Sequence, residues 1–318
     1  MTTHHIAFWN VENLFDVRTS PRRSDKLQRT IGKELKGWTQ AVLDTKLRQL
    51  AKVITWMNGG QGPDILGVCE VENAHVLQLL VDRLAGLGRD YGIAHHDGED
   101  GRGIDVAFIY DKDRFQAEET FSHYIVKRTA TRDLFQVNFR TKPGGNLLVL
   151  VGNHWPSRMG GQLESEPYRI IAGETLAYFH EGIRRALDSK DVAVMAMGDF
   201  NDEPSDRSLT GYALAERERG RVTRARSPKF LNLMWPLMGT GQATHYYGSE
   251  GSMLDQIMVS KGLLKKDLPL RVKTDSAAVL RHDEHAPKGV PVRYGRGSTR
   301  NEKGFSDHFP VCVEVEER

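Results

Sequence analysis

Short apolar runs of strand length recur along the whole chain, each bounded by polar or turn-forming residues. Runs of this length bounded in this way predict β-strands. We predict strands at residues 5–9, 65–69, 106–110, 147–152, 192–197, 253–259 and 310–315. The runs at 147–151 and 192–197 are apolar at every position, which is typical of strands covered on both faces.

Three stretches are predicted to be helical from the spacing of their apolar residues. Leu43, Leu47, Leu50, Ile54 and Met57 recur every four or three residues, and the glycine pair at 59–60 predicts the end of that helix. Similar stripes predict helices over 76–87 and from about 166 to 187. We find no internal repeat and no dividing linker, so we predict one domain over 1–318, with strands in packed layers and helices outside. Stretches without periodicity predict surface inserts near 211–250 and 281–303.

Composition narrows the class of protein. The 318 residues are 39% hydrophobic, which excludes disorder as the main state, and no apolar run of membrane-spanning length occurs. The start lacks the pattern of a secretory signal, and Cys69 and Cys312 are the only cysteines, so we expect a cytoplasmic protein with no disulfide framework. The 44 Lys and Arg nearly balance 42 Asp and Glu, which argues against a globally basic surface. Basic residues nevertheless concentrate in 217–229 and 281–303. No obligate protein partner is evident.

Polar side chains gather at the ends of the predicted strands. They are Asn10, Glu12 and Asn13; Glu70, Glu72 and Asn73; Asn153 and His154; Asp199, Asn201 and Asp202; Asp255; and Asp307 and His308. One such residue is usually a turn former or a helix cap. A set gathered at six strand ends instead predicts a functional edge of a layered fold.

The kinds of residue in this set indicate the chemistry. Carboxylates and amides without paired cysteines are ligands for a hard cation such as Mg²⁺ or Mn²⁺. His154 and His308 would transfer protons or donate to an anionic intermediate. Asn10, Asn153 and Asn201 would orient a water molecule or bond to phosphoryl oxygens. The set therefore predicts metal-assisted hydrolysis of a phosphate ester.

The order of these motifs resembles the endonuclease/exonuclease/phosphatase superfamily. The matching stretches are FWNVENLF at 8–15, DILGVCEVEN at 64–73, GIDVA at 103–107, GNHWPS at 152–157, GDFN at 198–201, LDQI at 254–257 and SDHFP at 306–310. The resemblance implies an α+β fold, a four-layer α/β/β/α sandwich of two mostly antiparallel sheets with outer helices.

The resemblance also implies a role for individual residues. Glu70 matches the metal-binding glutamate, Asp307 resembles an aspartate close to the metal, and Asn10 resembles an asparagine that assists at the metal and the phosphate. Asp199 and Asn201 match a pair that positions the attacking water and the phosphate.

The two histidines resemble those of the deoxyribonuclease-like branch. His308 is similar to a histidine that contacts the scissile phosphate, and Asp255 resembles the carboxylate that holds it. His154 matches the second histidine, and Asp105 is assigned as its partner.

Some residues have ordinary structural explanations. Arg102 and Arg158 lie beside two motifs, and each would either clamp a phosphate or be a solvated arginine. Glu72 is predicted to cap the helix that begins near Ala74 rather than to bind metal, and Asp202 is predicted to be a turn residue.

The sequence therefore favours a nuclease that uses Mg²⁺ or Mn²⁺ and takes nucleic acid as its substrate. Abasic endonucleases usually carry tyrosine in place of His154, and the residues after Asn201 and around Asp255 differ from those of inositol 5-phosphatases. One alternative is a phosphatase or phosphodiesterase acting on a small molecule or lipid headgroup. A more remote alternative is a non-catalytic binding scaffold.

Overall fold

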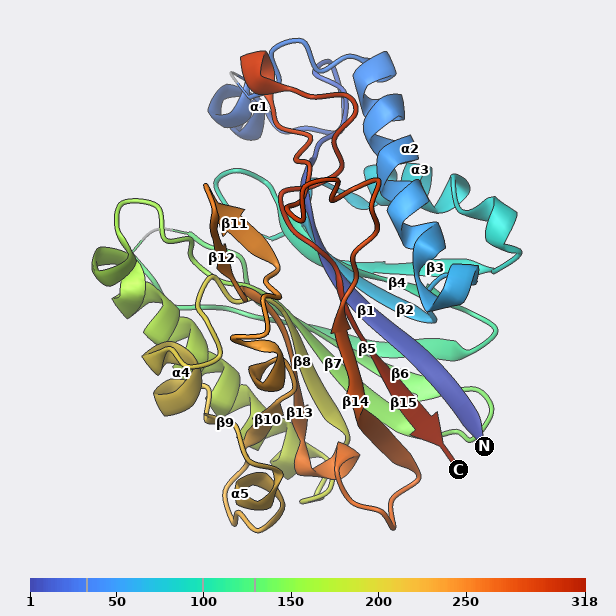
Figure 1. Ribbon diagram of the computed structural model, residues 1–318, viewed down its shortest axis with the longest axis vertical. Helices are drawn as coiled ribbons and strands as arrows, with labels where there is room; N and C mark the ends of the chain where they lie inside the picture. The colour runs from blue at the N-terminus through green and yellow to red at the C-terminus, as the bar shows by residue number, and fades with distance from the viewer. Residues whose placement is uncertain (33, 99, 129) are drawn as a thin grey trace.

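Two β-sheets pack face to face, with helices on both outer surfaces (Figure 1). The computed structural model describes residues 1–32, 34–98, 100–128 and 130–318. Helices α2 and α3 cover one sheet, and α4 covers the other. The predicted four-layer α+β sandwich is confirmed.

Each sheet is mixed, with one parallel pair near its middle. The six-stranded sheet has the order β14 (Leu270–Val279), β15 (Val311–Glu317), β1 (Thr2–Leu14), β2 (Ile65–Val71), β4 (Asp105–Asp111) and β3 (Tyr91–His95). The seven-stranded sheet has the order β5 (Phe115–His123), β6 (Leu134–Thr141), β7 (Leu147–His154), β8 (Val194–Asp199), β13 (Asp255–Ser260), β10 (Phe230–Asn232) and β9 (Ala215–Glu216). The central parallel pairs are β1 with β2 and β7 with β8, and β9 and β10 form a further short parallel pair at the edge of the seven-stranded sheet.

The remaining elements are a hairpin, five α-helices and short helical turns among the described residues. The hairpin consists of β11 (His245–Tyr247) and β12 (Glu250–Ser252). The α-helices are α1 (Asp25–Ile31), α2 (Gln40–Trp56), α3 (Ala74–Asp82), α4 (Gln162–Ala186) and α5 (Arg219–Thr223). Short 3-10 turns occur at Asn58–Gly60, Ala85–Leu87, Trp235–Leu237, Lys261–Leu263 and Gly297–Thr299, with a π-helical turn at Ser208–Tyr212. In the described chain, none of the helices has the length and apolarity of a membrane span.

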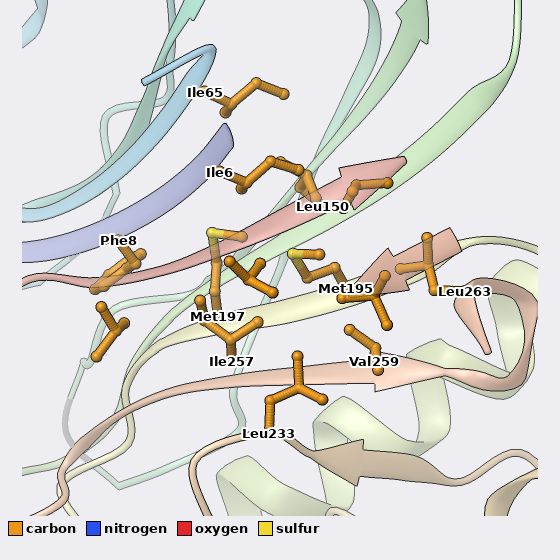
Figure 2. Close-up of a cluster of buried hydrophobic side chains, with 14 of the residues drawn as sticks. Ile6, Phe8, Ile65, Leu150, Met195, Met197, Leu233, Ile257, Val259 and Leu263 are labelled. Carbon is orange, nitrogen blue, oxygen red and sulfur yellow. The ribbon is translucent and has the colours of Figure 1, made fainter. Parts of the chain in front are cut away.

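Alternate residues of the central strands fill different layers. Ile6 and Phe8 of β1 face the second sheet, where they meet Leu150, Met195 and other inner residues (Figure 2). The residues between them on each strand pack against the helices, because side chains alternate across a strand. On the outer faces, Ala7 and Trp9 pack with α2 and α3, while Val149, Val151, Val194 and Ala196 pack with α4.

The seven predicted strands and three predicted helices are all present, with small shifts at their ends. The predicted helix over 76–87 ends earlier, at Asp82, and a 3-10 turn follows at Ala85–Leu87. Strands β3, β5, β6 and β14 and the short strands β9 to β12 were not predicted. Edge strands β5 and β14 expose many side chains, so they lack a continuous apolar run.

The two stretches predicted as inserts differ in structure. Residues 211–250 include β9 and β10, which extend the seven-stranded sheet, and the first strand of the hairpin. Residues 281–303 contain one 3-10 turn and otherwise irregular backbone. This second stretch runs beside α1 and α2 at the upper end of the molecule in Figure 1, whereas α5 of the basic stretch 217–229 lies at the lower end.

The buried imidazole of His180 makes acid stability a test of this packing. His180 is 3% exposed, it stacks on Phe230 at 4.1 Å between ring centroids, and burial lowers its pKa to about 3. As the pH falls, His180 therefore takes up a proton in the unfolded chain before it does so in the folded protein. Its contribution to the free energy of unfolding is complete above about pH 6.5 and is lost as the pH falls toward 3. We expect His180 to remove about 2 kcal/mol from the free energy of unfolding between pH 7 and pH 5. Urea unfolding at the two pH values measures this loss. In His180→Gln, the loss of unfolding free energy between pH 7 and pH 5 should be smaller by this contribution of His180. An equal loss in the variant and the unaltered protein would contradict the prediction.

Candidate active site

A cavity of about 610 Å³ opens at the edge where the central strands end. Each of the two central parallel pairs brings two carboxyl ends to this edge, because parallel strands end on the same side. Strands β13 and β15 run antiparallel to β8 and β1, so they begin where the others end. The topology thus delivers Asn10, Glu70, His154, Asp199 and His308 to one place, and all five line the cavity.

Asp199 is held in a fixed orientation by two amide groups. Its Oδ2 accepts a hydrogen bond from Asn10 Nδ2 at 3.1 Å, and its Oδ1 accepts from the backbone N–H of Asn201 at 2.9 Å. Asn201 has a left-handed φ of 51°, which turns the chain directly after the strand. A Cβ on Gly198 would lie 2.2 Å from the carbonyl oxygen of Asn153, so glycine is required for β7 and β8 to pack this closely.

His308 is held by a buried carboxylate. Its Nδ1 lies 2.7 Å from Asp255 Oδ2, and its Nε2 lies 3.9 Å from Asp199 Oδ2. Burial lowers the pKa of His308, but Asp255 and Asp199 outweigh this effect and raise the pKa well above its usual value. Burial raises the pKa of Asp199, which the positive charge of His308 opposes. His245 packs on His308 with ring centroids 4.6 Å apart, and its pKa is lowered to about 4 by burial and by that charge.

The surroundings of His154 favour the opposite protonation state. Its Nε2 lies 3.7 Å from Glu70 Oε1 and 3.8 Å from Asp199 Oδ2. Its Nδ1 is buried without a hydrogen-bond partner among the described residues. Burial and the nearby Arg132 lower the pKa of His154 well below its usual value, so the neutral imidazole is favoured. The cavity therefore favours the charged form of one histidine and the neutral form of the other.

Glu70 and Asp307 form an acidic wall of the cavity. Glu70 has a left-handed φ of 65°, and its Oε2 accepts the backbone N–H of Asn13 at 2.9 Å. The pKa of Glu70 is raised because burial disfavours its charged form and Asp307 adds negative charge. Asp307 Oδ2 lies 3.4 Å from Nη2 of Arg293.

The donor set of this wall fits a hard divalent cation. Glu70 Oε1 forms no hydrogen bond within the described chain, and a cation here would offset the repulsion between two carboxylates. Asp199, Asp255 and His308 also approach one another closely enough to form a three-ligand group. The short bond between Asp255 and His308 already uses one donor atom of each, so the wall is the stronger candidate for a cation site.

Four arginines line the cavity and make its rim cationic: Arg102, Arg158, Arg293 and Arg296. The first two were predicted from the sequence. Arg158 Nε donates to the carbonyl oxygen of Asn201 at 2.7 Å, so it also supports the turn after Asp199. The other two come from the stretch 281–303. No residue of the described stretch 217–229 lines this cavity.

The structure does not join Asp105 and Asn153 to the site in the way expected from the sequence. Asp105 Oδ2 lies 3.1 Å from His95 Nε2, so the predicted pairing with His154 is not found. The pairing of β3 with β4 brings His95 beside Asp105. The Asn153 side chain is fully buried, donates to the carbonyl oxygens of Val151 and Met197, and accepts from Trp155 Nε1. Its amide therefore supports the strands and does not line the cavity.

Glu72 and Asp202 are both held by arginines. Glu72 bonds to Arg23 Nε and Nη2 at 2.7 and 2.6 Å, and the cap of α3 is Asn73, whose side chain accepts from the backbone N–H of Val76. The predicted capping role of Glu72 is therefore wrong. Asp202 lies in the predicted turn and pairs with Arg169 at 2.7 Å.

Sequence reasoning missed other groups at the cavity. His245 and Tyr247 come from the hairpin, and Arg293 and Arg296 come from a stretch without periodicity. Glu12 lies inside the first motif but was given no role. The concentration of basic residues in 281–303 was the signal that pointed toward the arginines, although it did not indicate which of them reach the cavity.

Comparison with known proteins identifies the family of this chain and structures with a similar fold. The sequence matches the model of the Endonuclease/Exonuclease/phosphatase family over residues 5–317. Among curated proteins, none matches this sequence. Humanized TDP2 from D. rerio has a similar structure, with a TM-score of 0.61 and 15% identity over 99% of each chain. The human Nocturnin catalytic domain, with a bound sulfate anion, has a TM-score of 0.60 and 16% identity over 99% of this chain and 94% of that chain.

A third similar structure is the mannosyl-6-phosphatase from Bacteroides thetaiotaomicron, with a TM-score of 0.57 and 17% identity over 98% of this chain and 99% of that chain. Identities this low show a common fold and nothing more specific. The family match, in contrast, spans nearly the whole sequence. The chain therefore belongs to the Endonuclease/Exonuclease/phosphatase family.

Proposed function

We propose that this protein hydrolyses phosphodiester bonds with the help of a divalent metal ion, and we favour a nuclease. One observation carries the proposal: a buried aspartate, an Asp–His pair and two acidic metal-ligand candidates converge in a single cavity with a cationic rim. This is the equipment that phosphoester hydrolysis needs, because the reaction activates a water and builds negative charge on phosphorus-bound oxygens. Family membership supports hydrolysis of phosphoesters.

Each group has a defined part in this proposal. Asp199, fixed by the amides of Asn10 and Asn201, orients the attacking water and accepts its proton. Asp255 holds the imidazole of His308 so that Nε2 donates to a phosphoryl oxygen.

His154 is proposed to contribute a second imidazole beside Asp199. Glu70 and Asp307, with Asn10 nearby, would hold Mg²⁺ or Mn²⁺, and such an ion polarises a phosphoryl oxygen when bound. Arg102 and Arg158 would bind phosphate at the rim.

A phosphatase or diesterase acting on a small molecule is the second candidate. The volume of about 610 Å³ lies within the range of small-ligand pockets. The basic stretch 217–229, which favoured a polymer, contributes no residue to the lining of the cavity. A phosphatase also shares the fold, as the name of the mannosyl-6-phosphatase states.

Hydrolysis of a substrate panel tests the proposal and separates the two candidates. We expect cleavage of bis-p-nitrophenyl phosphate and of single-stranded DNA or RNA with Mg²⁺ or Mn²⁺, loss of cleavage with EDTA, and recovery with excess metal. Faster cleavage of p-nitrophenyl phosphate and sugar phosphates than of diesters would favour the phosphatase. Full activity in EDTA would contradict the metal requirement. Failure on the whole panel would revive the binding scaffold.

Salt dependence tests whether nucleic acid is the substrate. We expect the KM for a short single-stranded oligonucleotide to rise with salt, with a log–log slope of at most about 3, because four arginines line the cavity and each phosphate contact contributes about 0.7. The KM for bis-p-nitrophenyl phosphate is the control and should change far less. A flat response for the oligonucleotide would count against a polymeric substrate.

A further inference from the structure

The irregular segment at residues 293–295 is clamped by one buried carboxylate. Glu12 is 2% exposed, and its Oε1 accepts from Arg293 Nε at 3.0 Å, from Arg293 Nη2 at 2.8 Å and from the backbone N–H of Gly295 at 3.1 Å. Its Oε2 accepts the backbone N–H of Tyr294 at 2.8 Å. Glu12 has a left-handed φ of 51°, an uncommon conformation for a non-glycine residue. The first motif therefore fixes a segment nearly 300 residues away, at |i−j| of 281 to 283.

Tyr294, the residue after Arg293, anchors the same segment at a second point. Tyr294 is fully buried, and its hydroxyl donates to the carbonyl oxygen of Val42 at 2.9 Å. Its ring meets Trp38 edge-on at 6.0 Å, and Lys46 Nζ lies 4.8 Å from its centroid. The backbone that carries Arg293 is thus held on both sides. An arginine with a fixed base loses less side-chain entropy when it binds a ligand.

The guanidinium of Arg293 has an edge that is still available. Its Nε and Nη2 serve Glu12, and Nη2 lies 3.4 Å from Asp307 Oδ2. The two N–H groups of Nη1 have no hydrogen-bond partner among the described residues, and the side chain is 59% exposed at the cavity. Arg158 uses the same two nitrogens, with Nε donating to Asn201 at 2.7 Å and Nη2 pairing with Asp206 at 2.9 Å, but its side chain is only 24% exposed.

We propose that Arg293 binds the phosphoryl oxygens of the substrate through Nη1, beside Asp307, and that Glu12 is the residue that positions it. This inference rests on the proposed function, and it deepens that function by making the irregular stretch 281–303 part of the site. A planar guanidinium suits this task because its N–H groups match the geometry of phosphate oxygens. A purely structural reading makes Arg293 only the neutralising partner of buried Glu12.

Binding of inorganic phosphate separates the two readings without requiring turnover. In Mg²⁺ buffer, Arg293→Ala should weaken the calorimetric Kd for phosphate at least about tenfold and lower kcat/KM on bis-p-nitrophenyl phosphate by about 10- to 100-fold. Arg293→Lys should recover less than half of the binding free energy for phosphate that Arg293→Ala loses, because lysine keeps the charge but lacks the paired N–H groups of the planar guanidinium. Arg300→Ala is the matched control: Arg300 belongs to the same stretch, donates to the carbonyl oxygen of Gly37 and does not line the cavity.

A double-mutant cycle tests the positioning role of Glu12. Glu12→Gln should weaken phosphate binding in the same direction as Arg293→Ala, and the double variant should lose little beyond Arg293→Ala alone. An unchanged phosphate Kd in Arg293→Ala, or no phosphate binding by the unaltered protein, would overturn the inference. Loss of phosphate binding in Arg293→Ala, in a protein that hydrolyses nothing on the panel, would leave the inference standing and refute the proposed function.

Discussion

Replacing Asp199 by alanine is expected to lower kcat/KM on bis-p-nitrophenyl phosphate by about a thousandfold or more. Asp199 is the carboxylate on which the site converges. It accepts from Asn10 and Asn201 and lies within 3.9 Å of both His154 and His308. Asp199→Asn keeps the shape but cannot take a proton, so it should lose nearly as much activity.

The stability of Asp199→Asn, unlike its activity, should not fall. Burial raises the pKa of Asp199, so the charged form is costly in the folded state. The melting temperature of Asp199→Asn should therefore equal or exceed that of the unaltered protein, which separates loss of chemistry from loss of fold. Asp267→Ala, an exposed aspartate outside the cavity, is the control. A loss of less than tenfold in Asp199→Ala would refute the assignment.

Removing the imidazole of His308 is expected to have the second-largest effect, a loss of about 100- to 1,000-fold in kcat/KM. Its Nε2 faces Asp199, and its positive charge is maintained by the surrounding carboxylates, so alanine removes a donor to the developing phosphoryl charge. Asp255→Asn keeps the imidazole but removes the partner that orients and charges it. It should cost about 10- to 100-fold.

The order of these losses is the informative measurement. His308→Ala should exceed Asp255→Asn, and the double variant should lose about as much as His308→Ala alone, because Asp255 acts through the imidazole. His96→Ala, an exposed histidine outside the cavity, should keep full activity. Additive losses would show that Asp255 acts independently of His308, and a loss of less than tenfold in His308→Ala would contradict its role.

The strands of the sandwich could be predicted because their signals are local. The runs at 147–152 and 192–197 became β7 and β8, which lie side by side in the seven-stranded sheet. Strand β6 was not predicted, although its apolar and polar residues alternate. The apolar residues are Phe135, Val137 and Phe139, and the residues between them are Gln136 and Asn138. Those two amides are nearly buried and bond to each other, so the strand is less apolar than a covered strand usually is.

Candidate site residues could be predicted where a motif carries both the residue and its place at a strand end. Glu70, His154, Asp199, Asp307 and His308 all line the cavity. Motif membership did not distinguish Asn153, whose amide serves the strands, from Asn10, which bonds to Asp199.

Prediction from sequence was weakest for partners. Asp105 was paired with the wrong histidine, and Glu72 was expected to cap a helix but binds Arg23. The pairing of Asp255 with His308, implied by the family resemblance, is found in the structure, whereas local sequence does not show which cation the fold brings to a carboxylate.

The sequence by itself determined seven of the strands and three of the helices, because periodicity and turn chemistry act over a few neighbouring residues, and the order of its motifs indicated the family. Only the tertiary structure decided which polar groups meet. Asp105 meets His95 instead of His154, and Glu12 reaches Arg293 across 281 positions, through strand pairing and a long irregular segment. The tertiary structure also set the charges of the two histidines, because burial and neighbouring carboxylates shift a pKa, and both depend on contacts between distant parts of the chain.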